Sequence, residues 1–128
     1  MTYSDCTLGN HVYYARYLEL LEWARGEFFR QINEPFLKWQ RADTIFPVVE
    51  CRLRYRNAAR YDDLLTIEIW LTELERIRLN FGYRITNEAG AEVLAAATKH
   101  ACTSIDEKLK RLPEELASKL RPYCDPST

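Results

Sequence analysis

Residues 12–32 read VYYARYLELLEWARGEFFRQI, and the periodicity of this stretch decides the fold. Apolar side chains recur every three or four residues, which is the pattern of a helix with one buried face. That face consists of Tyr14, Tyr17, Leu18, Leu21, Arg25, Phe28 and Ile32. We predict a long helix over this stretch, with Asn10 as its N-cap and a break at Asn33 to Pro35.

Gly26 interrupts this helix, where a glycine costs about 1 kcal/mol relative to alanine. We predict that another backbone passes close to it. Small residues on the last predicted strand would allow such an approach; they are Ala91, Ala95, Ala96, Ala97 and Ala101. Two ion pairs at i,i+3 spacing, Glu22–Arg25 and Glu27–Arg30, are expected to support the helix.

The rest of the chain is dominated by period-two alternation, which is typical of half-buried β-strands. The predicted strands span residues 1–5, 49–55, 64–74, 76–86 and 91–105. The third long segment, Arg76–Thr86, alternates most clearly, and the turn Asn87–Gly90 closes a hairpin after it. A short helix is expected at Pro113–Arg121. One helix on a five-stranded antiparallel sheet is a two-layer α+β fold, which we expect to form one domain over residues 1–128.

The charge balance argues against a nucleic-acid binder, because 18 basic and 19 acidic residues give a net charge of −1. No apolar run is long enough to span a membrane and the first residues do not form a signal peptide, so a soluble, cytoplasmic protein is expected. The four cysteines, Cys6, Cys51, Cys102 and Cys124, are widely spaced and are expected to be free thiols. No metal site or cofactor motif is predicted.

A single helix covers little of a five-stranded sheet, and the sheet has open edges. Both properties favour an oligomer. We predict a homodimer or a homotetramer built as a dimer of dimers.

Residues 3–19, YSDCTLGNHVYYARYLE, resemble the entry motif of the hotdog-fold acyl-CoA thioesterases, in particular the 4-hydroxybenzoyl-CoA thioesterase-like family. The family motif reads roughly D-x-D-x-x-G-H-V-x-x-x-x-Y-L and runs from the first strand into the central helix. The matching positions are Asp5, His11, Val12, Tyr17 and Leu18. Glu22, Ala24 and Arg25 resemble its E-x-A-R continuation, and residues 61–65 resemble a turn between two of its strands.

The resemblance implies hydrolysis of an acyl thioester, with coenzyme A or a carrier-protein pantetheine as leaving group. Backbone N–H groups near Asn10 and His11 would then hold the oxyanion, while Thr7, Asp5 or Asn10 would position the water. Thr7 stands where the family usually has its catalytic aspartate. Hotdog thioesterases that release enediyne polyketides from a carrier protein resemble this chain in having a neutral residue there.

Two other functions are compatible with the same resemblance. The protein could bind an acyl-CoA or acyl carrier without turnover, since the usual carboxylate is missing. It could also be a small dehydratase-like hotdog protein. Of the histidine and acidic residue that such enzymes carry on the helix, only His11 fits.

Several candidate residues also have structural interpretations. Asp5 could cap a turn, Thr7 could be a turn residue bonded to nearby backbone, and His11 could be a packed histidine. Tyr14 and Tyr17 could be core residues or walls of the acyl pocket. Arg25 needs a partner if buried, which could be Glu22 or a carbonyl or carboxylate of the substrate.

Arginines gather on one face of the predicted sheet: Arg52, Arg54, Arg56, Arg76, Arg78 and Arg84. This face could meet coenzyme A phosphates or an acidic carrier protein, with Arg76 and Arg78 as candidate coenzyme A ligands. It could equally be a solvated face balanced by Glu50, Glu68 and Glu75. His100 and the cysteines are interpreted as structural or incidental.

Overall fold

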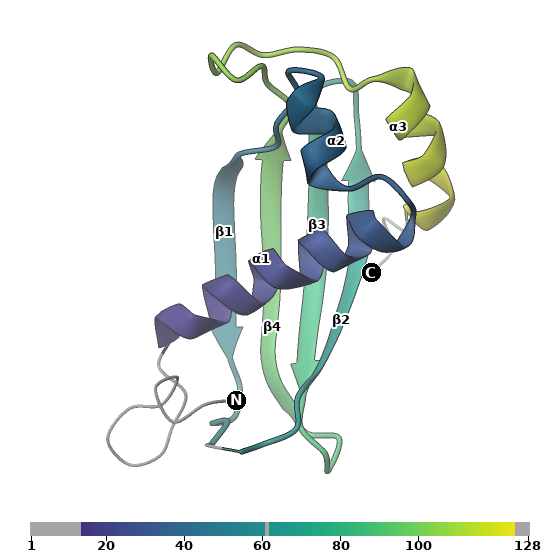
Figure 1. The fold of residues 1–128 in the computed structure, drawn as a ribbon. Coiled ribbons are helices and arrows are strands. Elements are labelled where there is room, and N and C mark those ends of the chain that lie inside the picture. Colours follow the sequence, from purple (N-terminus) through teal and green to yellow (C-terminus); the bar gives the residue numbers. More distant parts are fainter. Residues whose placement is uncertain (1–13, 61, 125–128) are drawn as a thin grey trace.

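The computed structural model describes residues 14–60 and 62–124, and its elements form two layers. The elements are α1 (Tyr14–Gln31), α2 (Phe36–Arg41), β1 (Val48–Tyr55), β2 (Thr66–Leu74), β3 (Arg78–Thr86), β4 (Glu92–Ala101), α3 (Glu114–Leu120) and a 3₁₀ turn at Arg121–Tyr123. Helix α1 lies across one face of the sheet, and α2 and α3 cover one end of that face (Figure 1).

Helix α1 confirms the predicted amphipathic helix, with 18 residues. It ends where Asn33 takes a left-handed conformation (φ 64°) and the Glu34 N–H donates to the Phe29 carbonyl at 2.8 Å. Its buried core residues are Tyr17, Leu21, Ala24 and Phe29. Leu18, predicted on the buried face, is exposed instead. In the part of the chain that the structure describes, no helix combines the length and hydrophobicity needed to cross a membrane.

The prediction of a close backbone contact at Gly26 is wrong. A methyl group added at this glycine would meet no atom within 4 Å. The glycine that does allow a close approach is Gly82 on β3, where an added methyl would lie 2.5 Å from the Trp70 indole nitrogen. The tight contact is therefore between a strand and a side chain, not between the helix and another backbone.

The sheet is antiparallel with strand order β1-β4-β3-β2. The described residues form four strands rather than the predicted five, and the fifth, expected at residues 1–5, lies outside the described residues. The predicted hairpin turn is confirmed: the Asn87 side chain accepts from the Ala89 and Ala91 N–H groups, and Gly90 has φ 85°. Strand β3 lies inside the sheet, and its core face is almost fully buried at Leu79, Phe81, Tyr83 and Ile85.

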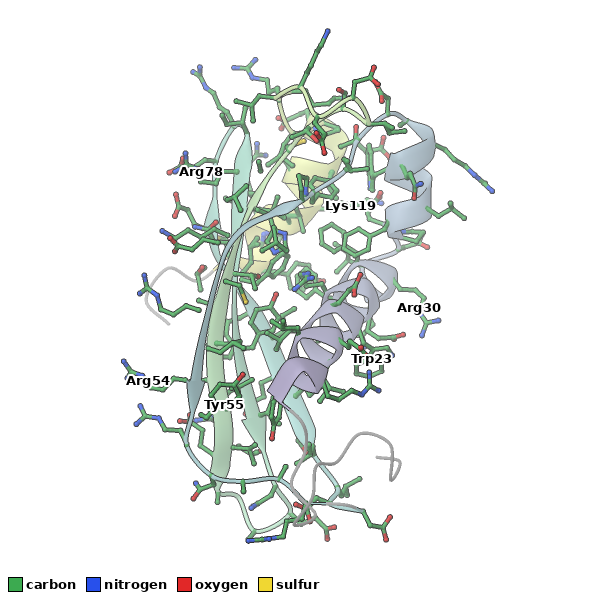
Figure 2. The ribbon with its side chains drawn as sticks, turned by 90° about the vertical axis from the view of Figure 1, so that its left-hand side faces the viewer. Trp23, Arg30, Arg54, Tyr55, Arg78 and Lys119 are labelled. Carbon is green, nitrogen blue, oxygen red and sulfur yellow. The ribbon has the colours of Figure 1, made fainter. Side chains whose placement is uncertain are left out.

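The outer face of the sheet carries the arginines, as Figure 2 shows for Arg54 and Arg78, which point away from α1. Much of this charge is balanced by acidic neighbours: Arg52 pairs with Glu50 at 3.7 Å, Arg56 with Glu92 at 3.3 Å and Arg84 with Glu68 at 2.9 Å. Edge strand β1 is exposed along nearly all its length. Its predicted apolar face is therefore only partly covered.

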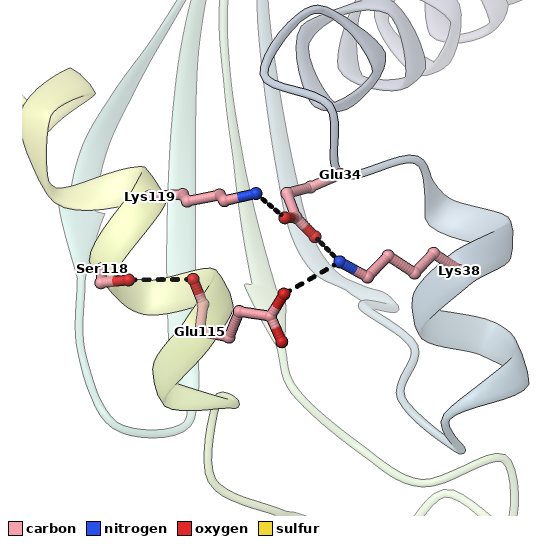
Figure 3. A network of polar contacts seen from close by, with 5 residues as sticks. All are labelled: Glu34, Lys38, Glu115, Ser118 and Lys119. Atoms are coloured by element: carbon pink, nitrogen blue, oxygen red, sulfur yellow. Dashed lines mark hydrogen bonds and ion pairs between the residues drawn. The ribbon is translucent and has the colours of Figure 1, made fainter.

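The α2 and α3 end is fastened by a charged cluster, the Glu34 clamp, which consists of Glu34, Lys38, Glu115 and Lys119 (Figure 3). The Glu34 carboxylate is fully buried and accepts from Lys38 of α2 at 2.8 Å and from Lys119 of α3. Lys38 also binds Glu115 at 3.1 Å. Helix α2 was not predicted, whereas α3 agrees with the predicted final helix, with Glu114 and Glu115 in its first turn and Lys119 in its last.

Candidate active site

All four predicted catalytic residues lie outside the described residues: Asp5, Thr7, Asn10 and His11. Their roles therefore stay predictions. Tyr14 begins α1, and its side chain also lies outside the described part of the structure. The described part of the candidate site consists of the cavity beside α1 and the side chains that reach it.

A cavity of about 390 Å³ lies between α1 and the β1 side of the sheet. It is lined by Leu18, Glu19, Leu21, Glu22, Arg25, Val48, Cys51 and Thr98. Arg25 and Glu22 also line a second cavity of about 200 Å³, which continues toward Phe36 and Phe46. Leu18 is thus exposed at a cavity wall. We refer to the larger space as the α1 cavity.

The two other predicted substrate-binding residues with described side chains have different surroundings. Tyr17 is buried in the core, and its ring lies 5.6 Å from that of Tyr55 on β1. Arg25 is half-buried and reaches across to the sheet, where its Nη1 donates to the Tyr83 hydroxyl at 3.1 Å. The predicted Glu22–Arg25 pair is wrong, because Arg25 turns toward the sheet while Glu22 stays exposed.

Behind Tyr83, three further hydrogen bonds continue into the sheet. The Tyr83 hydroxyl lies 2.7 Å from Thr98 Oγ1, which lies 2.8 Å from His100 Nε2. His100 Nδ1 lies 3.0 Å from the Phe46 carbonyl oxygen. Thr98 and His100 are alternate residues of β4 and share its core face, where Thr98 is a close neighbour of Tyr83 on β3. We call Arg25, Tyr83, Thr98 and His100 the Arg25 relay.

Burial controls the ionisation of the relay. Desolvation lowers the pKa of His100 to about 4, although its hydrogen bond to the Phe46 carbonyl opposes the shift. Desolvation also raises the pKa of Tyr83, against the effect of the neighbouring Arg25 guanidinium. At neutral pH both side chains are therefore uncharged, and the guanidinium is the charged group of the relay. Burial likewise raises the pKa of the Cys51 thiol in the cavity wall, so this cysteine is no activated nucleophile.

No carboxylate in the described part of the chain pairs with the Arg25 cation. Among residues 14–60 and 62–124 its only side-chain partner is the Tyr83 hydroxyl. An arginine carries five N–H donors, so most of them are available to a ligand. The α1 cavity therefore offers leucine and valine walls and the acidic side chains of Glu19 and Glu22. It also offers a cation that can bind a carbonyl, hydroxyl or carboxylate oxygen.

The predicted coenzyme A ligands Arg76 and Arg78 are not brought to this cavity. Arg76 lines a separate space of about 670 Å³ at the α3 end of β2, together with Arg111 and Arg121. Arg78 begins β3 and points away from α1 (Figure 2). In the described ranges no three His, Cys, Asp or Glu side chains gather in a way that could hold a metal ion.

The sequence and fold of this chain match known thioesterases. Residues 9–94 match the model of the thioesterase superfamily. The chain belongs to this family. It is 36% identical over 113 residues to the long-chain acyl-CoA thioesterase FadM of Escherichia coli, covering 86% of this chain and 84% of that protein. It is 31% identical over 118 residues to the acyl-CoA thioesterase YbgC of Haemophilus influenzae, covering 89% of this chain and 85% of that protein.

The fold agrees with that of solved proteins. A hypothetical protein from Thermus thermophilus superposes with a TM-score of 0.90 at 28% identity, covering 96% of this chain and 94% of that one. A DHNA-CoA thioesterase from Staphylococcus aureus superposes with a TM-score of 0.87 at 21% identity, which supports the hotdog fold alone. The thioesterase family that the sequence resemblance indicated is thereby confirmed.

Sequence reasoning singled out Arg25 but missed its partners. A charged residue on an apolar helical stripe was a sufficient signal for Arg25. The alternation of Arg76–Thr86 placed Tyr83 only on one face of a strand. His100 was interpreted as structural, and Thr98 was not singled out. A tyrosine, a threonine and a histidine on buried strand faces signal the need for hydrogen bonds, but not which partners satisfy them.

Proposed function

We propose that this protein is an acyl thioester hydrolase that binds the acyl group in the α1 cavity. Its substrates would be acyl-CoA or acyl-carrier thioesters, and its products a free acid and a thiol. The observation that carries the proposal is a partly apolar cavity beside α1 in a thioesterase-superfamily chain, with one cation, Arg25, that pairs with no carboxylate of the described residues. The named activities of FadM and YbgC make coenzyme A the first leaving group to test.

In the proposed reaction, water attacks the thioester carbonyl carbon. Backbone N–H groups near Asn10 and His11 hold the oxyanion, and Thr7, Asp5 or Asn10 positions the water. The carbon–sulfur bond then breaks, and the sulfur leaves as a thiol that takes up the proton lost by the water. No metal or tightly bound cofactor enters this scheme.

Arg25 is proposed as a substrate-binding residue in this scheme. Its guanidinium would bind an oxygen of the acyl group, while Leu18, Leu21 and Val48 would contact the hydrocarbon part. Tyr14 and Tyr17 would belong to the wall of the acyl pocket. Arg76 and Arg78 are kept as weaker candidates for binding the phosphates of coenzyme A or an acidic carrier.

We also propose that two copies associate through β1. Within the described residues no strand pairs with the outer edge of β1, and Val48 and Val49 are exposed there. An exposed, apolar edge strand is a site for pairing with a second chain. Val48 and Cys51 line the α1 cavity, so a partner on this edge would close its side. Analytical ultracentrifugation should give a dimer or tetramer, and Val49→Lys should shift it toward monomer; a wild-type monomer would contradict this.

The alternative is a binding protein that captures an acyl-CoA or acyl carrier without hydrolysis. Thr7 favours it, because a threonine hydroxyl cannot take a proton at neutral pH as a carboxylate can. The dehydratase alternative would be revealed by hydration of crotonyl-CoA.

A thiol-release assay across short, long and aromatic acyl-CoAs tests the proposal, using the wild type and the Thr7→Asp, Thr7→Ala and His11→Ala variants. We expect release by the wild type and slower release by Thr7→Ala and His11→Ala, with unchanged far-UV circular dichroism. Wild-type rates in both alanine variants would overturn the assigned site. Tight binding without release by the wild type, with activity gained in Thr7→Asp, would favour the binding protein.

A further inference from the structure

The hydrogen bonds behind Arg25 can run in only one direction. The Phe46 carbonyl oxygen can only accept, so His100 Nδ1 must carry the proton of that bond. A neutral histidine then has no proton on Nε2, and Nε2 must accept from the Thr98 hydroxyl. The Tyr83 hydroxyl consequently donates to Thr98, and its oxygen accepts from Arg25.

This single direction gives Arg25 a well-defined acceptor. A hydroxyl that could rotate freely would offer its lone pairs in many directions, whereas the Tyr83 proton is committed to Thr98. Tyr83, Thr98 and His100 are each at most 1% exposed, so water does not compete with these bonds. The Tyr83 oxygen is therefore held ready for the guanidinium.

We propose that Tyr83, Thr98 and His100 are positioning residues that hold the Arg25 guanidinium against the α1 cavity, where it selects acyl groups carrying a hydrogen-bond acceptor. The inference rests on the proposed function, because it takes the α1 cavity as the acyl site. It adds the substrate class: acyl thioesters with an oxo, hydroxyl or carboxylate group are preferred over unsubstituted alkyl chains of the same length.

Two physical effects support this selectivity. An arginine side chain has many rotamers, and fixing it before the substrate binds removes an entropic cost from recognition. Without Tyr83, the guanidinium could turn to the Glu22 carboxylate on the same helix, which lines the same cavity. An unsubstituted alkyl chain would in addition cover the Arg25 guanidinium without offering it a hydrogen-bond acceptor. A site that leaves its polar group unpaired in this way discriminates strongly against the alkyl substrate.

The main experiment compares kcat/KM for matched thioesters, acetoacetyl-CoA against butanoyl-CoA and adipoyl-CoA against hexanoyl-CoA. We expect the wild type to prefer the first member of at least one pair. Tyr83→Phe and Thr98→Val should each lower that preference about fivefold, the usual effect of one hydrogen bond. Thr98→Ser keeps the hydroxyl and should retain the substrate preference of the wild type.

The matched control is Thr103→Val. Thr103 is also a buried threonine, 5% exposed, but its hydroxyl donates to the Ser104 carbonyl. Thr103 does not line the α1 cavity. This variant should leave the substrate preference unchanged. An equal loss of preference in Thr103→Val would mean that any buried threonine has the same effect, and would overturn the relay.

A double-mutant cycle separates positioning from general packing. In an Arg25→Ala background, Tyr83→Phe should cause no further change in the substrate ratio, because the side chain that it positions is gone. A full further fivefold loss in that background would contradict the inference.

NMR of the imidazole nitrogens tests the relay without any activity. His100 should be the neutral tautomer protonated on Nδ1, and its signal can be assigned with His100→Gln because His11 is the only other histidine. A proton on Nε2 would overturn the inference. Absence of thiol release from every thioester would instead refute the proposed function and with it the selectivity. Release with ratios unchanged in Tyr83→Phe and Thr98→Val would refute the inference alone.

Discussion

The Glu34 clamp and the Arg25 relay both place polar groups among apolar side chains, but they compensate charge differently. In the clamp, one fully buried carboxylate is bound by two ammonium groups, Lys38 and Lys119. In the relay, one half-buried guanidinium is bound by a neutral hydroxyl. The clamp contains its own counterions, whereas the relay leaves a cation at the wall of a cavity.

The difference follows from where the two clusters lie. Glu34 lies in the loop between α1 and α2, and its lysines come from α2 and α3, so their attraction holds three segments together (Figure 3). The hydrogen bonds of the relay pass from α1 through β3 and β4 to the Phe46 carbonyl, and they start at a cavity. A buried charge that is fully paired is explained by stability alone. A cation that keeps unused donors at a cavity is better explained by ligand binding.

The largest expected effect is a pH dependence that comes from His100. Its folded pKa of about 4 lies below the ordinary value of 6.5, so the unfolded chain takes up the proton first as pH falls. The stabilisation is complete above pH 6.5 and is lost as pH falls toward 4, by about 3 kcal/mol. Urea unfolding of the wild type and His100→Gln over this range should show the steeper loss in the wild type.

A steeper loss in the wild type would show that the relay residues behind Arg25 are neutral, unlike the charged groups of the clamp. Arg25 is the charged group that faces His100, and it also disfavours the imidazolium. His11 is present in both proteins, so its titration cancels. Equal slopes for both proteins would show that His100 titrates normally and would remove the basis for a single hydrogen-bond direction.

The next largest effect is the loss of the clamp in Glu34→Gln. Burial raises the pKa of this carboxyl, but the hydrogen bonds from Lys119 and Lys38 outweigh burial and lower it. The carboxylate therefore stabilises the fold above its unfolded pKa, and this contribution is lost as pH falls through the lowered folded value. We expect Glu34→Gln to lower the free energy of unfolding at neutral pH by about 2 kcal/mol, measured by urea denaturation.

Two controls belong to this prediction. Glu115→Gln makes the same change in the same cluster at a mostly exposed side chain, and it should have a much smaller effect. The preference between acetoacetyl-CoA and butanoyl-CoA should be unchanged in Glu34→Gln. A changed preference would show that the Glu34 clamp also affects substrate binding, and would contradict its purely structural role.

Local pattern was sufficient to predict most of the elements. The alternation of Arg76–Thr86 became the buried core face of β3, and the turn at Asn87–Gly90 formed as predicted, because each depends on residues close in the chain. Gly26 shows the limit. The cost of a helical glycine is local, but what fills the space beside it depends on segments that the helix sequence does not contain.

The site divides in the same way. Arg25 could be predicted because its charge breaks an apolar stripe, yet the partner chosen from spacing, Glu22, was wrong. Its actual partner lies 58 residues away, and Tyr83 and Thr98 are a further 15 apart. Only the register of β3 against β4 brings these two side chains together, and single-residue patterns do not specify register. The N-terminal motif, in contrast, was sufficient to indicate the family that the match over residues 9–94 establishes.

The smallest effect on stability is expected for the exposed ion pair of α1, Glu27–Arg30. Glu27 and Arg30 were predicted to pair at i,i+3, and the structure has the Arg30 Nη2 at 2.5 Å and 2.7 Å from the two carboxylate oxygens. The Arg30 side chain is 70% exposed, so water competes with the pair and salt screens it. Glu27→Gln should lower the free energy of unfolding by about 0.5 kcal/mol or less, with less still at high salt. A loss of unfolding free energy as large as that in Glu34→Gln would contradict this. It would mean that the buried ion pairs of the Glu34 clamp stabilise the fold no more than the exposed Glu27–Arg30 pair.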